Sequence, residues 1–148
     1  CEVLVRAAAL LHVPVLFSEH CPDRIGALAP TLRVLAAADA IVAESHFSAA
    51  DEPAFAQRVA AGNRPQIVIA GMEAHVCVLQ TAIGFAERGY RAYVVADACG
   101  SRDDGSRAIA LDRLRVAGIG VVTTEMVLFE WLEHAGRPEL GELIALVK

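Results

Sequence analysis

A single cysteine lies where an α/β protein can present a nucleophile. Cys77 belongs to the segment AGMEAHVCVLQTA (70–82), which follows an apolar run and opens a helical pattern. In the first turn of a helix, unpaired N–H groups and the positive end of the helix dipole favour a thiolate. The same N–H groups would hold the oxyanion of an acyl intermediate. The alternative is that Cys77 is a small buried apolar side chain, as free cysteines often are.

Five short runs rich in Val and Ile are typical of buried parallel strands. They are VPVLFSE (13–19), AIVAES (40–45), PQIVIAG (65–71), RAYVVAD (91–97) and GIGVVTTE (118–125). Segments with helical spacing alternate with them, at 27–38, 51–62, 76–89 and 103–118. Because parallel strands need crossover connections, this order predicts a three-layer α/β/α fold with a parallel sheet. Cys77 then follows the carboxyl end of a strand, where such sheets bind ligands.

The two ends of the chain are predicted to be helical. The segment EVLVRAAALLH (2–12) favours a helix that leads into the first visible strand, with a strand at CEVLV (1–5) as the alternative. Near the other end, the pattern predicts a helix to about Ala135, a Gly-Arg-Pro turn and a short terminal helix. The segment DDGSR (103–107) is expected to cap the helix that follows it.

Composition limits the class of protein. The 148 residues are 55% hydrophobic and 21% charged, which predicts one domain over 1–148. A net charge of −5 with no basic cluster argues against nucleic-acid binding, and no apolar run is long enough for a membrane span. The four cysteines lack metal-like spacing, so we predict a cytoplasmic protein with free thiols and no cofactor.

One long string resembles the isochorismatase-like cysteine hydrolase family, in its isochorismatase domain-containing branch. That string is IAGMEAHVCVLQTAIGFAERGYRAYVVADACGSR (69–102), and VPVLFSEHCP, FSAADEPAF and ALDRLRVAGIGVVTTEMVLFEWL extend the likeness over nearly the whole chain. The resemblance implies a Rossmann-like parallel sheet of six strands and a covalent intermediate on Cys77. It also implies a non-proline cis peptide at Met72–Glu73 and an oxyanion hole from the backbone N–H groups of Val76 and Cys77.

The sequence departs from the family pattern at two catalytic positions. Glu44, in AESHFSA, stands where the family has a lysine, and the strand that carries the family's aspartate would lie upstream of Cys1. A carboxylate near a thiol raises the thiol pKa, so Glu44 is expected to lower the reactivity of Cys77. Glu44 is therefore either a general base that replaces the aspartate or a polar residue at a strand end.

The missing strand concerns the fold as well, because in the family it lies in the centre of the sheet, between the strands at 13–19 and 65–71. Without it, the hydrogen-bond ladder would break there. Three possibilities follow: the native protein has more residues upstream, CEVLV or another segment fills the gap, or the flanking strands close together. We favour the first of these.

Further polar residues lie near the same sheet edge. His75, Glu73, Glu19 and Asp97 are predicted to line a substrate pocket, although His75 fits a structural turn residue equally well and Asp97 an acceptor of backbone N–H groups. The consecutive Glu19, His20 and Cys21 lack the alternate spacing that brings two metal ligands together, so we predict no metal.

The leading hypothesis is a cysteine hydrolase that acts on a small amide or a related C–N or C–O bond of a small-molecule substrate. The alternatives are a catalytically degenerate member that serves as an oligomeric scaffold or small-ligand binder, and a thiol redox sensor at Cys77. The apolar last helices and the family predict a homo-oligomer. Few arginines lie near the expected pocket, which disfavours a strongly anionic substrate such as isochorismate.

Overall fold

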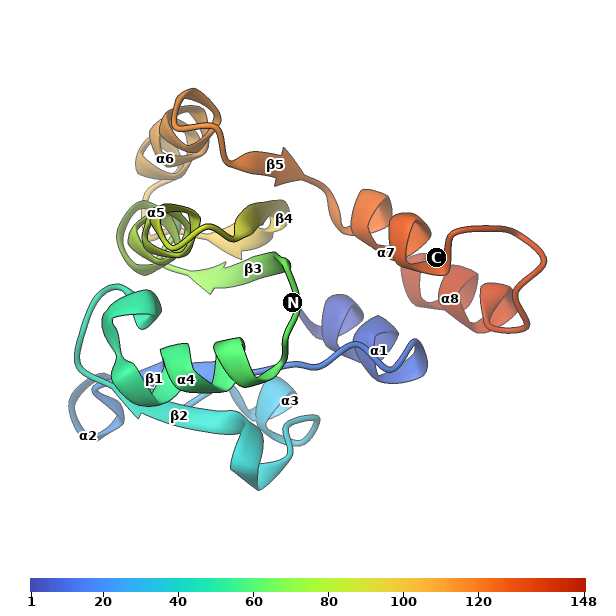
Figure 1. Cartoon of the computed structure of the whole chain (residues 1–148), viewed down its shortest axis with the longest axis horizontal. Coiled ribbons are helices and arrows are strands. Elements are labelled where there is room, and N and C mark those ends of the chain that lie inside the picture. The colour runs from blue at the N-terminus through green and yellow to red at the C-terminus, as the bar shows by residue number, and fades with distance from the viewer.

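The computed structural model describes every residue from Cys1 to Lys148 (Figure 1). Its strands are β1 (Phe17–His20), β2 (Ile41–Glu44), β3 (Gln66–Met72), β4 (Arg91–Gly100) and β5 (Gly120–Val122). Its α-helices are α1 (Glu2–Leu10), α2 (Pro22–Ile25), α3 (Pro30–Arg33), α4 (Pro53–Ala61), α5 (Leu79–Glu87), α6 (Asp104–Val116), α7 (Thr124–Leu132) and α8 (Leu140–Val147). Short helical turns lie at η1 (Ala38–Ala40), η2 (Ala49–Asp51) and η3 (Ala74–Val78).

The strands form two separate parallel sheets. β1 pairs with β2, and β3, β4 and β5 form a sheet in that order. β1 and β3 are not hydrogen-bonded to each other, so the ladder is broken where the family's central strand would lie. Figure 1 shows the two sheets as distinct groups of arrows. Closure of the flanking strands onto each other, one of the three possibilities left open by the sequence, is therefore not what the structure shows.

The larger sheet is covered by helices on both faces, which confirms the predicted three layers. Val94 and Val95 are adjacent in β4, both fully buried, and point to opposite faces. Val94 belongs to an apolar cluster with Leu79 of α5 and Leu114 of α6. Val95 belongs to a second cluster with side chains of α1, α7 and α8. Two cores thus sandwich one sheet.

The first segment is a helix, as predicted, and the alternative of a strand at CEVLV is wrong. The helix α1 buries Leu4, Ala7 and Ala8 on one face, against α7 and α8. Residues three and four apart share a helix face, so this pattern is buried better by a helix than by a strand. No segment of the chain fills the gap between β1 and β3.

Two predicted helices are shorter than expected. The segment 27–38 is α-helical only at Pro30–Arg33, because it finds no buried partner: Val34 is 81% exposed. A short isolated helix is marginal without packing. The helix α7 ends at Leu132 rather than near Ala135, because Glu133 takes a positive φ of 69°. The predicted cap at 103–107 is confirmed, since the Asp103 carboxylate accepts from the Ser106 N–H.

Candidate active site

Cys77 lies in a tight turn between β3 and α5. The chain leaves β3 at Met72, passes a cis peptide bond to Glu73, and enters the π-helical turn η3, which contains Cys77. The predicted cis peptide is therefore confirmed. Ala74 and Val78 anchor this turn in the core, whereas Cys77 itself is only partly buried. The thiol sits in the first turn of a helix at the carboxyl end of a strand, as predicted.

The surroundings of Cys77 raise the pKa of its thiol. Burial raises the Cys77 pKa most, and the negative charges of Glu44 and Glu73 raise it further. A backbone hydrogen bond from Glu73 works in the opposite direction but does not reverse the shift. The direction expected from Glu44 is thus confirmed, and deprotonation of Cys77 requires a base or a nearby cation.

Glu44 is a buried carboxylate with an unpartnered oxygen. It ends β2, is 6% exposed, and its Oε2 has no hydrogen-bond partner. Burial raises the Glu44 pKa most, while a hydrogen bond from Ser18 and the proximity of His20 lower it. A buried carboxylate of this kind is suited to take up and release a proton.

The histidines near Glu44 are held by other contacts. The His20 Nδ1 lies 3.2 Å from the His46 carbonyl, and the His20 ring stacks on Phe47 with 5.0 Å between centroids. The His46 Nδ1 lies 3.3 Å from the Glu52 carboxylate. Glu52 raises the Glu44 pKa and the two histidines lower it, while burial keeps the net shift upward.

A second polar cluster lies beside Cys77 at the end of β4. The Glu73 Oε2 accepts from the Arg102 backbone N–H at 2.9 Å, and the Arg102 Nε lies 3.6 Å from the same oxygen. The His75 Nδ1 lies 3.0 Å from the Ser101 Oγ and 3.6 Å from the Glu73 Oε2. Two of the predicted pocket residues, Glu73 and His75, are thus brought together next to the thiol.

One of the two predicted oxyanion donors, the Val76 N–H, is already engaged in a hydrogen bond. The Val76 N–H donates to the Glu73 carbonyl at 3.1 Å, and the Val78 N–H donates to the same carbonyl at 3.2 Å. An oxyanion at Val76 would compete with that carbonyl.

The other two predicted pocket residues have structural contacts. Glu19 accepts from the Leu28 N–H at 2.8 Å and from Arg33 at 3.1 Å, which ties down the loop after α2. Asp97 accepts from the N–H and the hydroxyl of Thr124, at 2.8 and 3.0 Å, and so joins β4 to the start of α7. This is the alternative role that the sequence indicated for Asp97.

Sequence reasoning missed Ser18 and Glu52, which both act on Glu44. A usable signal existed for Ser18: it lies two residues before His20, which is in register with Glu44 across the β1–β2 pair. Alternate residues of a strand share a face. Glu52 comes from the far end of a loop, which no periodicity places.

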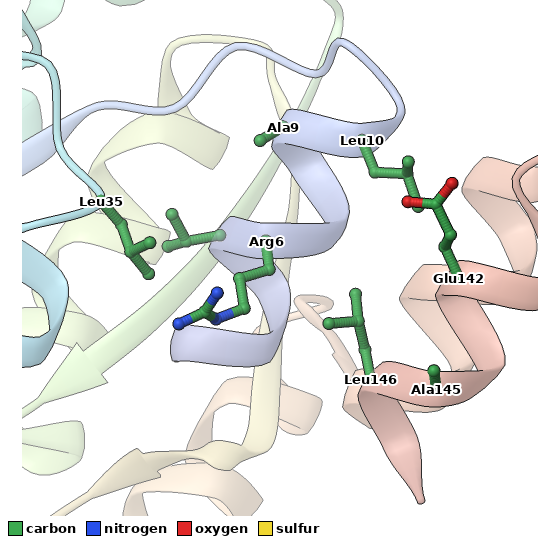
Figure 2. Close-up of a pocket in the computed structure, with 8 residues that line it drawn as sticks. Arg6, Ala9, Leu10, Leu35, Glu142, Ala145 and Leu146 are labelled. Carbon is green, nitrogen blue, oxygen red and sulfur yellow. The ribbon is translucent and has the colours of Figure 1, made fainter.

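A groove away from Cys77 lies between α1 and α8. It has a volume of about 500 Å³, and Figure 2 shows Arg6 and Glu142 on opposite sides of it. None of its lining residues belongs to the surroundings of Cys77. No three His, Cys, Asp or Glu side chains are grouped so as to hold a metal ion, and none of the helices is long and apolar enough to span a membrane.

An α/β/α fold with a cysteine at the carboxyl end of a strand is the architecture expected of the isochorismatase-like hydrolases. The family model of the isochorismatase domain matches residues 1–126, and the chain belongs to this family. Isochorismatase domain-containing protein 2 from Bos taurus is 34% identical over 148 residues, covering 98% of this chain and 70% of the relative. Family membership supports a hydrolase-type function.

Solved structures agree with this assignment. The MAR1 ribonuclease from Caenorhabditis elegans superposes with a TM-score of 0.91 at 30% identity, over 99% of this chain and 75% of that one. The ycaC gene product of Escherichia coli is described as an octameric hydrolase of unknown specificity. It superposes with a TM-score of 0.87 at 27% identity, over 97% of this chain and 72% of that one. YcaC from Pseudomonas aeruginosa, in a structure with hexane-2,5-diol and covalent acrylamide, superposes with a TM-score of 0.87 at 25% identity, over 97% of this chain and 73% of that one.

Proposed function

We propose that this protein is a cysteine hydrolase that cleaves a small amide, with Cys77 as nucleophile and Glu44 as general base. The observation that carries the proposal is a buried carboxylate, Glu44, whose charge raises the pKa of the Cys77 thiol. Glu44 has an unpartnered Oε2, and its charge acts on the same thiol whose pKa is raised. A thiol whose pKa is raised needs such a base to become nucleophilic.

The reaction proceeds in two balanced steps. Glu44 accepts the proton of Cys77, the sulfur attacks the amide carbon, and the resulting oxyanion binds at the N–H groups of the η3 turn, which include Cys77 and Val76. The C–N bond then breaks, the amine leaves with the proton from Glu44, and a thioester remains. Water gives a proton to Glu44 and attacks the thioester, the C–S bond breaks to release the acid, and the leaving sulfur takes the proton back from Glu44, which restores the Cys77 thiol and the Glu44 carboxylate.

Two comparisons support parts of this proposal. The covalent acrylamide of the Pseudomonas YcaC shows that a structural neighbour carries a side chain that reacts with electrophiles. The Escherichia neighbour is octameric, from which we propose that this chain also forms a homo-oligomer that acts on a small molecule. The ribonuclease name belongs to the Caenorhabditis protein. The two carboxylates near Cys77 argue against a phosphodiester substrate here, because they repel it.

The test is amine release from a panel of small amides, together with the intact mass of the protein. Wild-type protein should release amine and show a transient acyl adduct on Cys77. Cys77→Ser should lower kcat/KM by at least about 1,000-fold and Glu44→Gln by about 100-fold. Cys1→Ser, a matched change at an exposed thiol away from Cys77 and Glu44, should match the wild type. Hydrolysis that survives Cys77→Ser would sink the proposal.

One observation favours a second candidate, a family member that binds a small ligand without turnover. Burial and the two carboxylates all raise the Cys77 pKa, which slows any reaction that needs the thiolate. Saturable binding of an amide without amine release would support this candidate. The same raised pKa argues against a redox sensor, which requires a thiol of low pKa.

A further inference from the structure

Glu73 is hydrogen-bonded to the backbone on both sides of Cys77. Its carbonyl accepts from the Val76 N–H at 3.1 Å and from the Val78 N–H at 3.2 Å, and these two residues flank the cysteine. Paired backbone groups of this kind fix the path of the chain through a turn. The place of the Cys77 thiol therefore follows the place of Glu73.

The side chain of Glu73 reaches the loop after β4. Its Oε2 accepts from the Arg102 backbone N–H at 2.9 Å. Next to this bond, His75 of the η3 turn places its Nδ1 3.0 Å from the Ser101 Oγ. The side chains of His75 and Glu73 are only 26% and 24% exposed, so water competes only in part for these contacts. Two contacts thus join the turn of Cys77 to two consecutive residues of one loop.

This loop is itself held at both ends. The strands β3 and β4 pair up to Met72 and Gly100, which are in register, so the chain leaves the two strands side by side. Beyond the loop, Asp103 caps α6, and the buried face of α6 lies in the apolar core. A loop between a paired strand and a packed helix is a fixed support for the turn that contacts it.

We propose that Glu73 and Ser101 are positioning residues, which hold the Cys77 turn against the loop after β4. The inference rests on the proposed function, because it concerns how the proposed nucleophile is placed. Neither residue has to contact the substrate for this role. A misplacement of about 1 Å can cost on the order of 100-fold in rate, so the two contacts matter for a thiol that attacks beside the N–H groups of its own turn.

Amide hydrogen exchange, read by NMR, tests the contacts without any substrate. Glu73→Ala removes the acceptor of the Arg102 N–H, whereas Glu73→Gln keeps an oxygen that can accept it. The amides of Val76 and Val78 should exchange about tenfold or more faster in Glu73→Ala than in Glu73→Gln. Glu87→Ala is the matched control, because Glu87 is exposed at the end of α5, and it should leave both amides unchanged. Equal exchange in Glu73→Ala and the wild type would overturn the proposal.

The pH profile of Cys77 alkylation separates positioning from charge. The charge of Glu73 raises the Cys77 pKa, so Glu73→Gln and Glu73→Ala should lower the midpoint alike, while the charge of Glu44 stays in every variant. Ser101→Ala removes the partner of His75 and leaves both charges in place. A loosened turn exposes the partly buried thiol, so the plateau rate with iodoacetamide should rise about threefold or more in Glu73→Ala and Ser101→Ala, but not in Glu73→Gln.

Circular dichroism checks that each variant folds. Equal plateau rates in all three folded variants would mean that Glu73 acts on the thiol by its charge alone, and the proposal would be wrong.

Hydrolysis of the amide panel separates this inference from the proposed function. In Ser101→Ala, kcat should fall by about tenfold or more with little change in KM, because a misplaced nucleophile slows the chemical step and leaves binding intact. Hydrolysis by the wild type with an unchanged kcat in Ser101→Ala leaves the hydrolase standing and overturns the positioning role. Altered exchange and alkylation in a protein that hydrolyses no amide supports the positioning of the thiol and counts against the hydrolase.

Discussion

At the scale of residues, the proposed chemistry depends on two side chains, the Cys77 thiol and the Glu44 carboxylate. The negative charge of Glu44 raises the pKa of Cys77, because a thiolate is unfavourable beside an existing negative charge. The sequence identified both residues through the family motif, and it also indicated the sign of the effect. It did not indicate that Glu44 would be 94% buried, since burial depends on the loop that carries Glu52.

The pH dependence of Cys77 alkylation measures how far burial and the nearby carboxylates raise the pKa of the thiol. Because burial, Glu44 and Glu73 raise its pKa, the rate with iodoacetamide should rise with a midpoint above the unperturbed value of about 8.5. Glu44→Gln removes one of the causes and should move the midpoint to lower pH. The midpoint is read from the alkylated peptide, with Cys77→Ser as the blank. A wild-type midpoint below the unperturbed value would contradict the raised pKa.

Glu44 also makes stability depend on pH. Its folded-state pKa is raised above the unfolded value, so its contribution is fully present below the unfolded pKa and is lost as pH rises through the folded pKa. The loss is about 1.4 kcal/mol for each unit by which the pKa is raised. Urea unfolding at pH 4 and pH 8 should therefore show a larger loss for the wild type than for Glu44→Gln. Equal losses would show that the Glu44 pKa is not raised.

At the scale of elements, strand ends and helix starts were predictable where local chemistry specifies them. Apolar runs that end in small or acidic residues located all five strands, and Asp103 indicated the start of α6. The helix at 27–38 was overpredicted, because helical spacing does not reveal whether a partner surface exists. Asp97 shows the same limit, since a carboxylate at a sheet edge serves a pocket or a helix start equally well by sequence.

Asp97→Ala distinguishes those two roles. The substitution removes both hydrogen bonds to Thr124, so the free energy of unfolding should fall by about 1 to 2 kcal/mol, as for loss of a helix cap. The alkylation rate of Cys77 should stay unchanged, because Asp97 does not act on that thiol. Chemical denaturation and peptide mass spectrometry check the two expectations. Unchanged stability with altered alkylation would instead place Asp97 in the pocket.

At the scale of the whole molecule, the two residues of the candidate site come from different sheets, and the apolar core packs on only one of these sheets. Glu44 ends the two-stranded sheet, whereas Cys77 follows the three-stranded one. Both large apolar clusters pack on the three-stranded sheet, and neither includes a residue of β1 or β2. The sequence predicted that the ladder breaks without a central strand, but not how the core would be shared between the two parts.

The unequal packing of the two sheets predicts that rates of amide hydrogen exchange differ among the strands. β4 is paired on both sides and buries Val94 and Val95 completely, so its amides should exchange slowest. β3 and β5 are paired on one side and should follow. β1 and β2 make only a two-stranded sheet outside both cores, and their amides should exchange fastest, by about tenfold or more relative to β4. Glu44 belongs to the two-stranded sheet. Local opening of that sheet would therefore separate the Glu44 carboxylate from the Cys77 thiol before β4 unfolds. Exchange measured by mass spectrometry on peptides from each strand decides the matter, and uniform protection across all five strands would mean that the two sheets open as a single cooperative unit.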